Sequence, residues 1–253
     1  MGVAHLGAAD TAQSNLIDQH PPGQSVVDDA APFFTAAQHP DRETHRFRLA
    51  IRKTGAVTTS AISFGRDIPD DRELRLCGDI SGGRRALELG VSREMNAIAF
   101  ALAGAKSIAV DPDPSTIEHL RQAATKAEVT VECHVGDPAD LGFATSGSIE
   151  LVVANHTLVD VDDLGRQLRQ VHRVLKASHP LLISVPHPFA GVHTTDQYGS
   201  KVHPYGTVGR TIGDWHTQLS RANFRVDHIL ELGVSNISPV PTTLLLRARK
   251  EGD

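Results

Sequence analysis

The feature that most constrains the fold is a regular alternation of short apolar runs and longer amphipathic segments, which begins after Gly82-Gly83. The short runs predict strands at Arg85–Leu89, Ser107–Val110, Val129–Val135, Ile149–Ala154 and Leu181–Val185. The longer segments predict helices at Arg93–Ala103, Ser115–Lys126 and Asp162–Leu175. Repeated strand–helix–strand units give a parallel sheet with helices on both faces, because each crossover packs its helix back onto the sheet.

The C-terminal part follows a different pattern. A helix is predicted at Asp214–Ala222, followed by strands at Phe224–Leu232 and Thr242–Arg249 with only a loop between them. Two neighbouring strands joined without a crossover helix are antiparallel. The predicted fold class is therefore α/β: a doubly wound, mostly parallel seven-stranded sheet with a C-terminal antiparallel hairpin.

The sequence divides into three regions. Residues 1–31 contain few large apolar side chains and predict a loosely ordered or disordered arm. Residues 32–79 predict a lead-in segment with a helix at His39–Arg52 and a short helix at Asp70–Leu76. Residues 80–253 form the predicted α/β domain.

Three local signals set helix ends and faces. Gly104 predicts the C-terminal cap of the helix before it, and Ser115 with Glu118 predicts a capping box for the next helix. Arg166, Arg169 and Arg173 share one helix face, which we interpret as solvated.

Composition excludes several classes of function. Twenty-five Lys and Arg against 30 Asp and Glu give a net charge of −5, which argues against binding to nucleic acid or anionic membranes. No apolar run approaches the roughly 18 residues of a membrane span, and the first ten residues lack the pattern of a secretory signal. Cys77 and Cys133 are the only cysteines, and the 14 His form no metal-binding motif, so we expect a cytoplasmic protein without a metal.

Candidate site residues follow the predicted strands. In doubly wound sheets a ligand binds beyond the carboxyl ends of the strands, near the point where strand order reverses. Asp111 lies 21 residues past Gly90 (111 − 90), where a carboxylate can accept hydrogen bonds from both ribose hydroxyls of a nucleotide. Asp137, after the third strand, can accept from an adenine amino group. An Asp at a strand end also caps turns, so each residue has a purely structural interpretation as well.

The sequence resembles the class I S-adenosylmethionine-dependent methyltransferases over roughly Ile62 to Lys250. The resemblance rests on an ordered set of segments: ALELG (86–90), NAIAFALAGA (96–105), VDPDP (110–114), GDPADL (136–141), ELVVANHTLVDVDDL (150–164), HRVLK (172–176), LLISVPHPF (181–189), RTIGDWHTQLSRANFRVDHILEL (210–232) and LLLRARK (244–250). The upstream segment SFGRDIPDDRELRLCGD (63–79) is similar to the lead-in of a bacterial subgroup that methylates small molecules.

The resemblance implies a Rossmann-like methyltransferase fold, S-adenosylmethionine as the cofactor and a small molecule as the methyl acceptor. It also implies a cofactor site, in which Glu88 and Gly90 lie beside the methionine part, Asp111 holds the ribose and Asp137 the adenine edge. Asn155 and His156 would run beneath the cofactor, and Phe64 with Gly65 would close over it.

One departure from the family pattern concerns the glycine turn. The family's turn reads E-x-G-x-G-x-G, whereas this chain keeps Gly90 and has Ser92 and Glu94 at the next two glycine positions. Ser92 can cap the following helix. Glu94 suits the positive end of that helix, but it also brings a negative charge near the carboxylate of the cofactor.

A hydroxyl acceptor needs a base, and His has the appropriate pKa. His187 and His156 end adjacent predicted strands, and we favour His187 of the two as the catalytic residue. The insertion at residues 191–211, which contains His193, Tyr198 and His203, would form a wall or lid over the acceptor.

Three functions remain open on the sequence. The first is methyl transfer from S-adenosylmethionine to a small molecule. The second is a non-catalytic member that has lost the cofactor and acts as a binding or assembly partner, which Ser92 and Glu94 favour. The third, a nicotinamide-dependent dehydrogenase, needs G-x-G-x-x-G, which GVSREM (90–95) lacks. The oligomeric state does not follow from the sequence.

Overall fold

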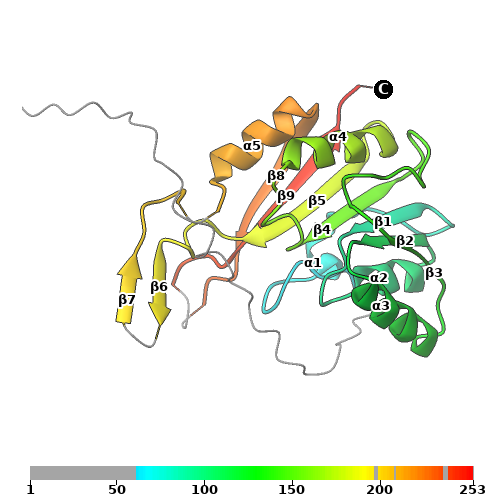
Figure 1. Cartoon of the computed structure of the whole chain (residues 1–253), viewed down its shortest axis with the longest axis horizontal. Coiled ribbons are helices and arrows are strands. Elements are labelled where there is room, and N and C mark those ends of the chain that lie inside the picture. Colours follow the sequence, from blue (N-terminus) through cyan, green and yellow to red (C-terminus); the bar gives the residue numbers. More distant parts are fainter. Residues whose placement is uncertain (1–60, 197–198, 208, 236–238, 253) are drawn as a thin grey trace, which may run out of the picture. The chain divides into compact units, whose positions relative to one another are not determined.

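The computed structural model describes residues 61–196, 199–207, 209–235 and 239–252 (Figure 1). The predicted arm over residues 1–31, the predicted helix at His39–Arg52 and Tyr198 lie outside the described residues. The division into three regions stays a prediction. Of the lead-in, residues 61–79 are described, and they include a short helix, α1 (Asp71–Leu74), inside the predicted range.

One sheet of seven strands organises the chain, in the order β3-β2-β1-β4-β5-β9-β8. Its strands are β1 (Arg85–Leu89), β2 (Lys106–Asp111), β3 (Val131–Val135), β4 (Leu151–Asn155), β5 (Pro180–Pro186), β8 (Phe224–Leu232) and β9 (Thr243–Lys250). The first five pair in parallel, and β9 pairs antiparallel with both β5 and β8. The predicted doubly wound, mostly parallel sheet with a C-terminal antiparallel hairpin is confirmed.

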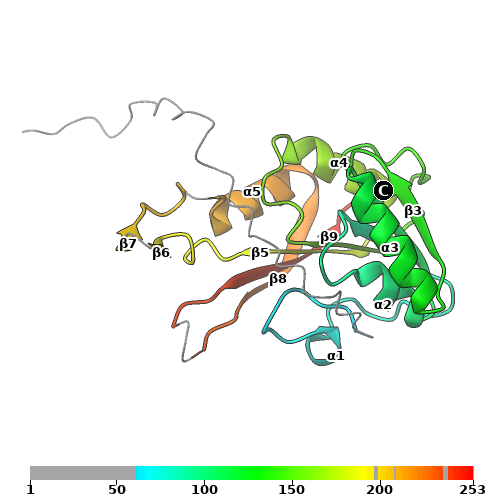
Figure 2. The ribbon, with the colours of Figure 1, turned by 60° about the horizontal axis from the view of Figure 1, so that its bottom comes forward.

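Helices cover both faces of this sheet (Figures 1 and 2). They are α2 (Asn96–Leu102), α3 (Pro114–Lys126), α4 (Leu164–Val174) and α5 (Ile212–Arg221). On one face α4 and α5 bury Leu168, Val171 and Trp215 against β4, β5 and β9. On the other face α2, α3 and the lead-in pack their apolar side chains, with Phe100 from α2 and Phe64 from the lead-in among the fully buried ones.

The strand order reverses between β1 and β4. The chain runs from β1 outward through β2 to β3, and then returns to the other side of β1 to form β4 and β5. Right-handed crossovers in opposite directions place their helices on opposite faces, which leaves an opening at the carboxyl ends of β1 and β4. This reversal therefore positions the candidate site.

A two-stranded hairpin in the insertion was not predicted from the sequence. Strands β6 (His193–Asp196) and β7 (Gly199–Val202) pair with each other in a separate sheet. Both views show the hairpin projecting beyond the end of β5 (Figures 1 and 2). The residues after the hairpin, through Arg210, then lead into α5.

The predicted starts of α2, α3, α4 and α5 each differ from the structure by one to three residues. Asp113, not Ser115, caps α3: its carboxylate accepts a hydrogen bond from the Ser115 backbone N–H at 2.8 Å, and Pro114 takes the first helical position. Glu118 accepts from Gln122 instead of completing a capping box. Helix α2 begins at Asn96 rather than Arg93, because the turn after β1 is longer than the pattern indicated. In the described ranges no helix combines the length and apolarity needed to cross a bilayer.

Gly90 ends β1 in a conformation that other residues adopt only with strain. Its φ is +75°, and a Cβ atom built there would lie 2.6 Å from the Cβ of Thr157. Thr157 follows β4, and its hydroxyl donates a hydrogen bond to the Leu89 carbonyl at 2.5 Å. Glycine is therefore required both by the backbone conformation and by the close approach of the β4 end.

Replacement of Gly90 should cost much more stability than replacement of a glycine with the same backbone but open surroundings. We expect Gly90→Ala to lower the free energy of unfolding by about 2–4 kcal/mol, from left-handed strain together with overpacking. Gly78 (φ +70°) has no atom within 4 Å of its built Cβ. Gly78→Ala should therefore cost only about 1 kcal/mol. Urea denaturation of both variants measures the difference, and equal losses would contradict the steric argument.

Candidate functional site

A cleft of about 530 Å³ opens at the carboxyl ends of the parallel strands. It brings together three of the predicted site residues, Gly90 after β1, Asp111 at the end of β2 and Asp137 after β3. The rest of its lining comes from the loops after the strands and from α4: Pro112, Pro138, Ala139, Thr157, Val161, Asp162, Asp163, Arg166 and Gln167. Its volume is in the range of small-molecule binding sites.

Asp111 joins the first two strand ends. One carboxylate oxygen accepts from the Val91 N–H at 2.8 Å, and the other accepts from the Asp113 N–H at 2.9 Å. Each carboxylate oxygen has two lone-pair positions, so both oxygens keep one for a ligand. The contact with Val91 holds the glycine turn against β2 and leaves Asp111 half-buried on the wall of the cleft.

Asp137 forms an ion pair across the cleft. Its Oδ2 lies 3.3 Å from Nη1 of Arg166 on α4, and its Oδ1 accepts from the Ala139 N–H. The interpretation of the three arginines as a solvated face is thus incomplete. Arg169 is exposed, but Arg173 donates to the carbonyls of Leu141 and Ala144, and Arg166 is part of the cleft wall. Spacing along a helix cannot reveal such partners, because they come from other elements.

Glu88 lies beneath the site and does not line the cleft. It is fully buried in β1, and its carboxylate accepts from the backbone N–H groups of Ser92, Asn96 and Ala97 and from the Ser92 hydroxyl. Helix α2 has no capping bond from its own N-cap residue, so Glu88 satisfies the free N–H groups at its start. Burial raises the pKa of Glu88 to about 7, although these four hydrogen bonds oppose the shift.

Asn155 lies at the end of β4 and contacts the residue that replaces the family's last turn glycine. Its side chain is 1% exposed, and its Nδ2 donates to Glu94 Oε2 at 3.0 Å. Its Oδ1 accepts from the Ser184 hydroxyl of β5 at 2.5 Å. The Glu94 carboxylate therefore reaches from the β1–α2 turn to the end of β4.

His156 follows Asn155 with a φ of +57°, which is uncommon for a residue other than glycine. Its Nε2 lies 3.2 Å from the Phe64 carbonyl oxygen, so in the neutral ring Nε2 carries the proton and Nδ1 is the acceptor. Burial lowers the pKa of His156, while the nearby negative charge of Glu94 and the Phe64 carbonyl raise it. Phe64 thus meets His156 through its backbone, and its ring is buried in the core.

His187 has both ring nitrogens engaged. The Phe189 N–H donates to Nδ1 at 3.1 Å, so Nε2 carries the proton that is shared with Glu231 Oε1 at 2.8 Å. The side chain is 0% exposed, and neither His187 nor His156 lines the cleft. In this arrangement neither ring nitrogen of His187 has a free lone pair that could take a proton from the methyl acceptor.

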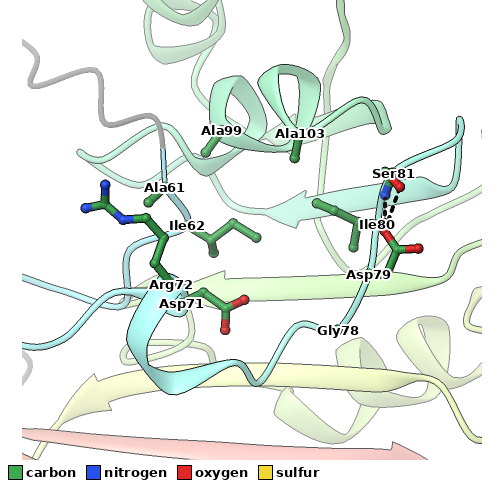
Figure 3. Close-up of a pocket in the computed structure, with 10 residues that line it drawn as sticks. All are labelled: Ala61, Ile62, Asp71, Arg72, Gly78, Asp79, Ile80, Ser81, Ala99 and Ala103. Carbon is green, nitrogen blue, oxygen red and sulfur yellow. Dashed lines mark hydrogen bonds between the residues drawn. The ribbon is translucent and has the colours of Figure 1, made fainter.

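A second hollow, of about 250 Å³, lies between α1, the segment before β1 and α2 (Figure 3). Each charged side chain that lines this hollow already has a hydrogen-bond or ion-pair partner in the protein. Asp71 accepts from the Leu76 and Cys77 N–H groups, Arg72 pairs with Asp70, and Asp79 bonds Ser81. No group of three or more metal-ligating side chains was found among the residues that the structure describes.

Among the cleft residues that sequence reasoning missed, two contact a predicted site residue. Thr157 packs against Gly90, and Arg166 pairs with Asp137 across the cleft. Thr157 belongs to the segment that follows β4, but nothing in the sequence indicates that its side chain packs against the glycine turn. Arg166 could have been found only from the position of α4 over the cleft.

Comparisons with known proteins match part of this domain to one family model. Residues 87–183 match the family model described as "Methyltransferase domain". No curated protein matches the sequence. The match spans β1 to β5, and so it contains every strand end that lines the cleft.

Solved structures are similar over most of the chain. A putative S-adenosylmethionine-dependent methyltransferase from Listeria monocytogenes has a TM-score of 0.59 at 18% identity, covering 72% of this chain and 96% of that one. An S-adenosylmethionine-dependent methyltransferase from Mesorhizobium loti has a TM-score of 0.58 at 19% identity, covering 71% and 96%. Geranyl diphosphate C-methyltransferase from Streptomyces coelicolor A3(2) has a TM-score of 0.54 at 12% identity, covering 70% and 77%. The fold predicted from the family resemblance is confirmed.

The buried Glu88 carboxylate should make stability depend on pH. Its pKa in the folded protein, about 7, lies above the ordinary value of 4.5 that holds in the unfolded chain. Between pH 4.5 and 7 the unfolded chain has already released this proton, whereas the folded protein still holds it. The protonated Glu88 side chain therefore stabilises the folded protein below pH 4.5, and this contribution of about 3 kcal/mol to the free energy of unfolding is lost as pH rises to 7. Urea denaturation from pH 4 to 8 measures this loss. Glu88→Gln should lack that component of the pH profile, and an unchanged profile would contradict the shift.

The electrostatic effect of Glu94 on the pKa of His156 can be tested by titration. We expect NMR of the imidazole resonances to give His156 a midpoint below 6.5, and Glu94→Gln to lower it further, because the charge that raises the pKa is removed. Glu118→Gln, which removes a carboxylate from the exposed face of α3, is the control. A midpoint that does not respond to Glu94→Gln would place the Glu94 carboxylate away from His156.

Proposed function

We propose that this chain, which carries a class I methyltransferase domain, binds S-adenosylmethionine in the cleft and methylates a small-molecule acceptor. The observation that carries the proposal is the convergence of Gly90, Asp111 and Asp137 on one cleft, where strand order reverses. These are three successive strand ends, in the order expected for a nucleoside lying along the edge of the sheet. The fold by itself would not distinguish catalysis from binding.

The residues of the cleft fit the adenosine part of the cofactor. Asp111 keeps a lone-pair position on each oxygen for the two ribose hydroxyls. Asp137 is assigned to accept from the adenine amino group, and Arg166 would close that end of the cleft through its ion pair with Asp137. Asp162 and Asp163 add negative charge to the lining, which favours a ligand with net positive charge.

The cofactor supplies a methyl group on a cationic sulfur that is reactive without further activation. The protein then has to align the acceptor, exclude water and take up a proton where the acceptor loses one. We assign the proton acceptor to Nδ1 of His156, because the Phe64 carbonyl holds the proton on Nε2. Of the two candidate histidines, His187 is assigned a positioning role through Phe189 and Glu231, since both of its nitrogens are engaged.

The acceptor site is proposed to lie towards the insertion that contains β6 and β7. Phe189 after β5 is 52% exposed, and its ring contacts that of Tyr205 at 5.4 Å between centroids. This pair offers an aromatic wall of the kind that small apolar acceptors contact. The similar enzyme from Streptomyces coelicolor was crystallised with geranyl diphosphate and S-adenosyl-L-homocysteine, which favours a small acceptor here.

Both cysteines are unpaired, which fits the reducing cytoplasm expected from the sequence.

The second candidate function is a non-catalytic member of the family that no longer binds the cofactor. The observation that favours it is the position of Glu94, whose carboxylate accepts a hydrogen bond from the Asn155 amide at the end of β4. Such a protein would keep the cleft and the fold but gain no stability from the cofactor or its product.

The proposed function predicts binding of S-adenosylhomocysteine, the product of methyl transfer, in the cleft. At 100 times its dissociation constant the ligand should stabilise the protein by about 2.7 kcal/mol. Asp111→Asn should weaken binding roughly tenfold to a hundredfold, because charge-assisted hydrogen bonds contribute about 1.5–3 kcal/mol. Isothermal titration calorimetry measures both effects.

Asp162→Asn is the matched control for this experiment, since it removes the same charge from an exposed position in the same cleft. We expect it to change affinity by about twofold. A well-folded sample that releases no heat with millimolar product would contradict the proposed function and favour the non-catalytic alternative.

A further inference from the structure

Glu94 places a carboxylate at the end of β4, next to the strand ends that line the cleft but outside its lining. Its Oε2 accepts from Asn155 Nδ2 at 3.0 Å, although the two residues lie 61 positions apart in the sequence. The Ser184 hydroxyl donates to Asn155 Oδ1, and this bond orients the amide so that its Nδ2 faces Glu94. Asn155 and Ser184 are each 1% exposed, so the donor that Glu94 uses is held in place by a buried network.

None of the ion pairs found among the described residues includes Glu94. Its negative charge acts on the ring of His156, as the upward contribution to the pKa of that histidine indicates. Any ligand group that reaches the end of β4 meets an anion there.

Strand order determines which part of a nucleoside ligand reaches Glu94. Along the edge of the sheet the strands run β3, β2, β1, β4, spaced by about 4.8 Å, so the ends of β3 and β4 are about 14 Å apart. A base at Asp137 after β3 and a ribose at Asp111 on β2 direct the 5′ substituent past Gly90 towards β4. The tail of an adenosyl ligand therefore points to Asn155 and Glu94.

We propose that Glu94 selects adenosyl ligands by their tail: it disfavours a tail that ends in a carboxylate and favours one that carries only an amine. This inference rests on the proposed function, because it assumes that the adenosine part binds in the cleft. The Asn155 amide is a hydrogen-bond donor at the end of β4. Glu94 already takes one N–H of this amide and repels a second anion, whereas it attracts an ammonium group.

These two effects can be separated by substitution. Glu94→Gln keeps an oxygen for Asn155 and removes only the charge, while Glu94→Ala also frees the Asn155 amide. The ligands are S-adenosylhomocysteine, its decarboxylated analogue with an amine-only tail, and 5′-methylthioadenosine, which has no charged tail. Calorimetry with the full chain gives a dissociation constant for each pair of variant and ligand.

We expect the wild-type chain to bind the decarboxylated analogue at least tenfold more tightly than S-adenosylhomocysteine. Glu94→Gln should tighten S-adenosylhomocysteine about tenfold and weaken the decarboxylated analogue, and Glu94→Ala should tighten S-adenosylhomocysteine further. Methylthioadenosine should stay within about twofold in all variants, since it has no charged tail for Glu94 to act on. Glu118→Gln on α3 is the charge-matched control and should change none of these values.

Two results would overturn the inference, and they can be told apart. If methylthioadenosine and both tailed ligands bind, but their affinity ratios are the same in wild type, Glu94→Gln and Glu94→Ala, then Glu94 does not select the tail and the proposed function stands. If no adenosyl ligand binds to any variant, methylthioadenosine included, the proposed function itself is wrong and the inference falls with it.

Discussion

The candidate site depends on one buried carboxylate. Glu88, fully enclosed in β1, accepts hydrogen bonds from three backbone N–H groups and one hydroxyl, and so fixes the turn between β1 and α2. Without these bonds the first N–H groups of α2 would be buried without partners. The course of this turn places Gly90 against Thr157 and directs the Glu94 side chain to the end of β4.

The sheet supplies the second constraint, since it brings distant residues to one edge. Parallel pairing aligns the ends of β2 and β1, and Asp111 strengthens the alignment by accepting from the Val91 N–H across that edge. The reversal of strand order beside β1 opens the cleft that Asp111 and Asp137 line. An acidic lining suits a cationic ligand, while the separate anion at Glu94 acts on only one end of it.

The two candidate histidines differ for reasons that only their surroundings provide. Each follows a parallel strand of the seven-stranded sheet, His156 directly after β4 and His187 directly after β5. His156 meets the Phe64 carbonyl of the lead-in, which fixes one tautomer and leaves Nδ1 as an acceptor. His187 is held between the Phe189 N–H and Glu231 of β8, so its ring serves the turn after β5.

The sequence by itself determined the strands and helices of the α/β domain, the terminal hairpin and the strand-end positions of Gly90, Asp111 and Asp137, because periodicity and turn residues are local signals. It did not determine the start of α3, the β6–β7 hairpin, the partners of Arg166 and Arg173, or the different environments of His156 and His187. Only the tertiary structure decided these, since each depends on a contact between segments far apart in the chain. Glu94 illustrates both: the sequence marks it as a departure from glycine, and packing alone brings its charge to Asn155.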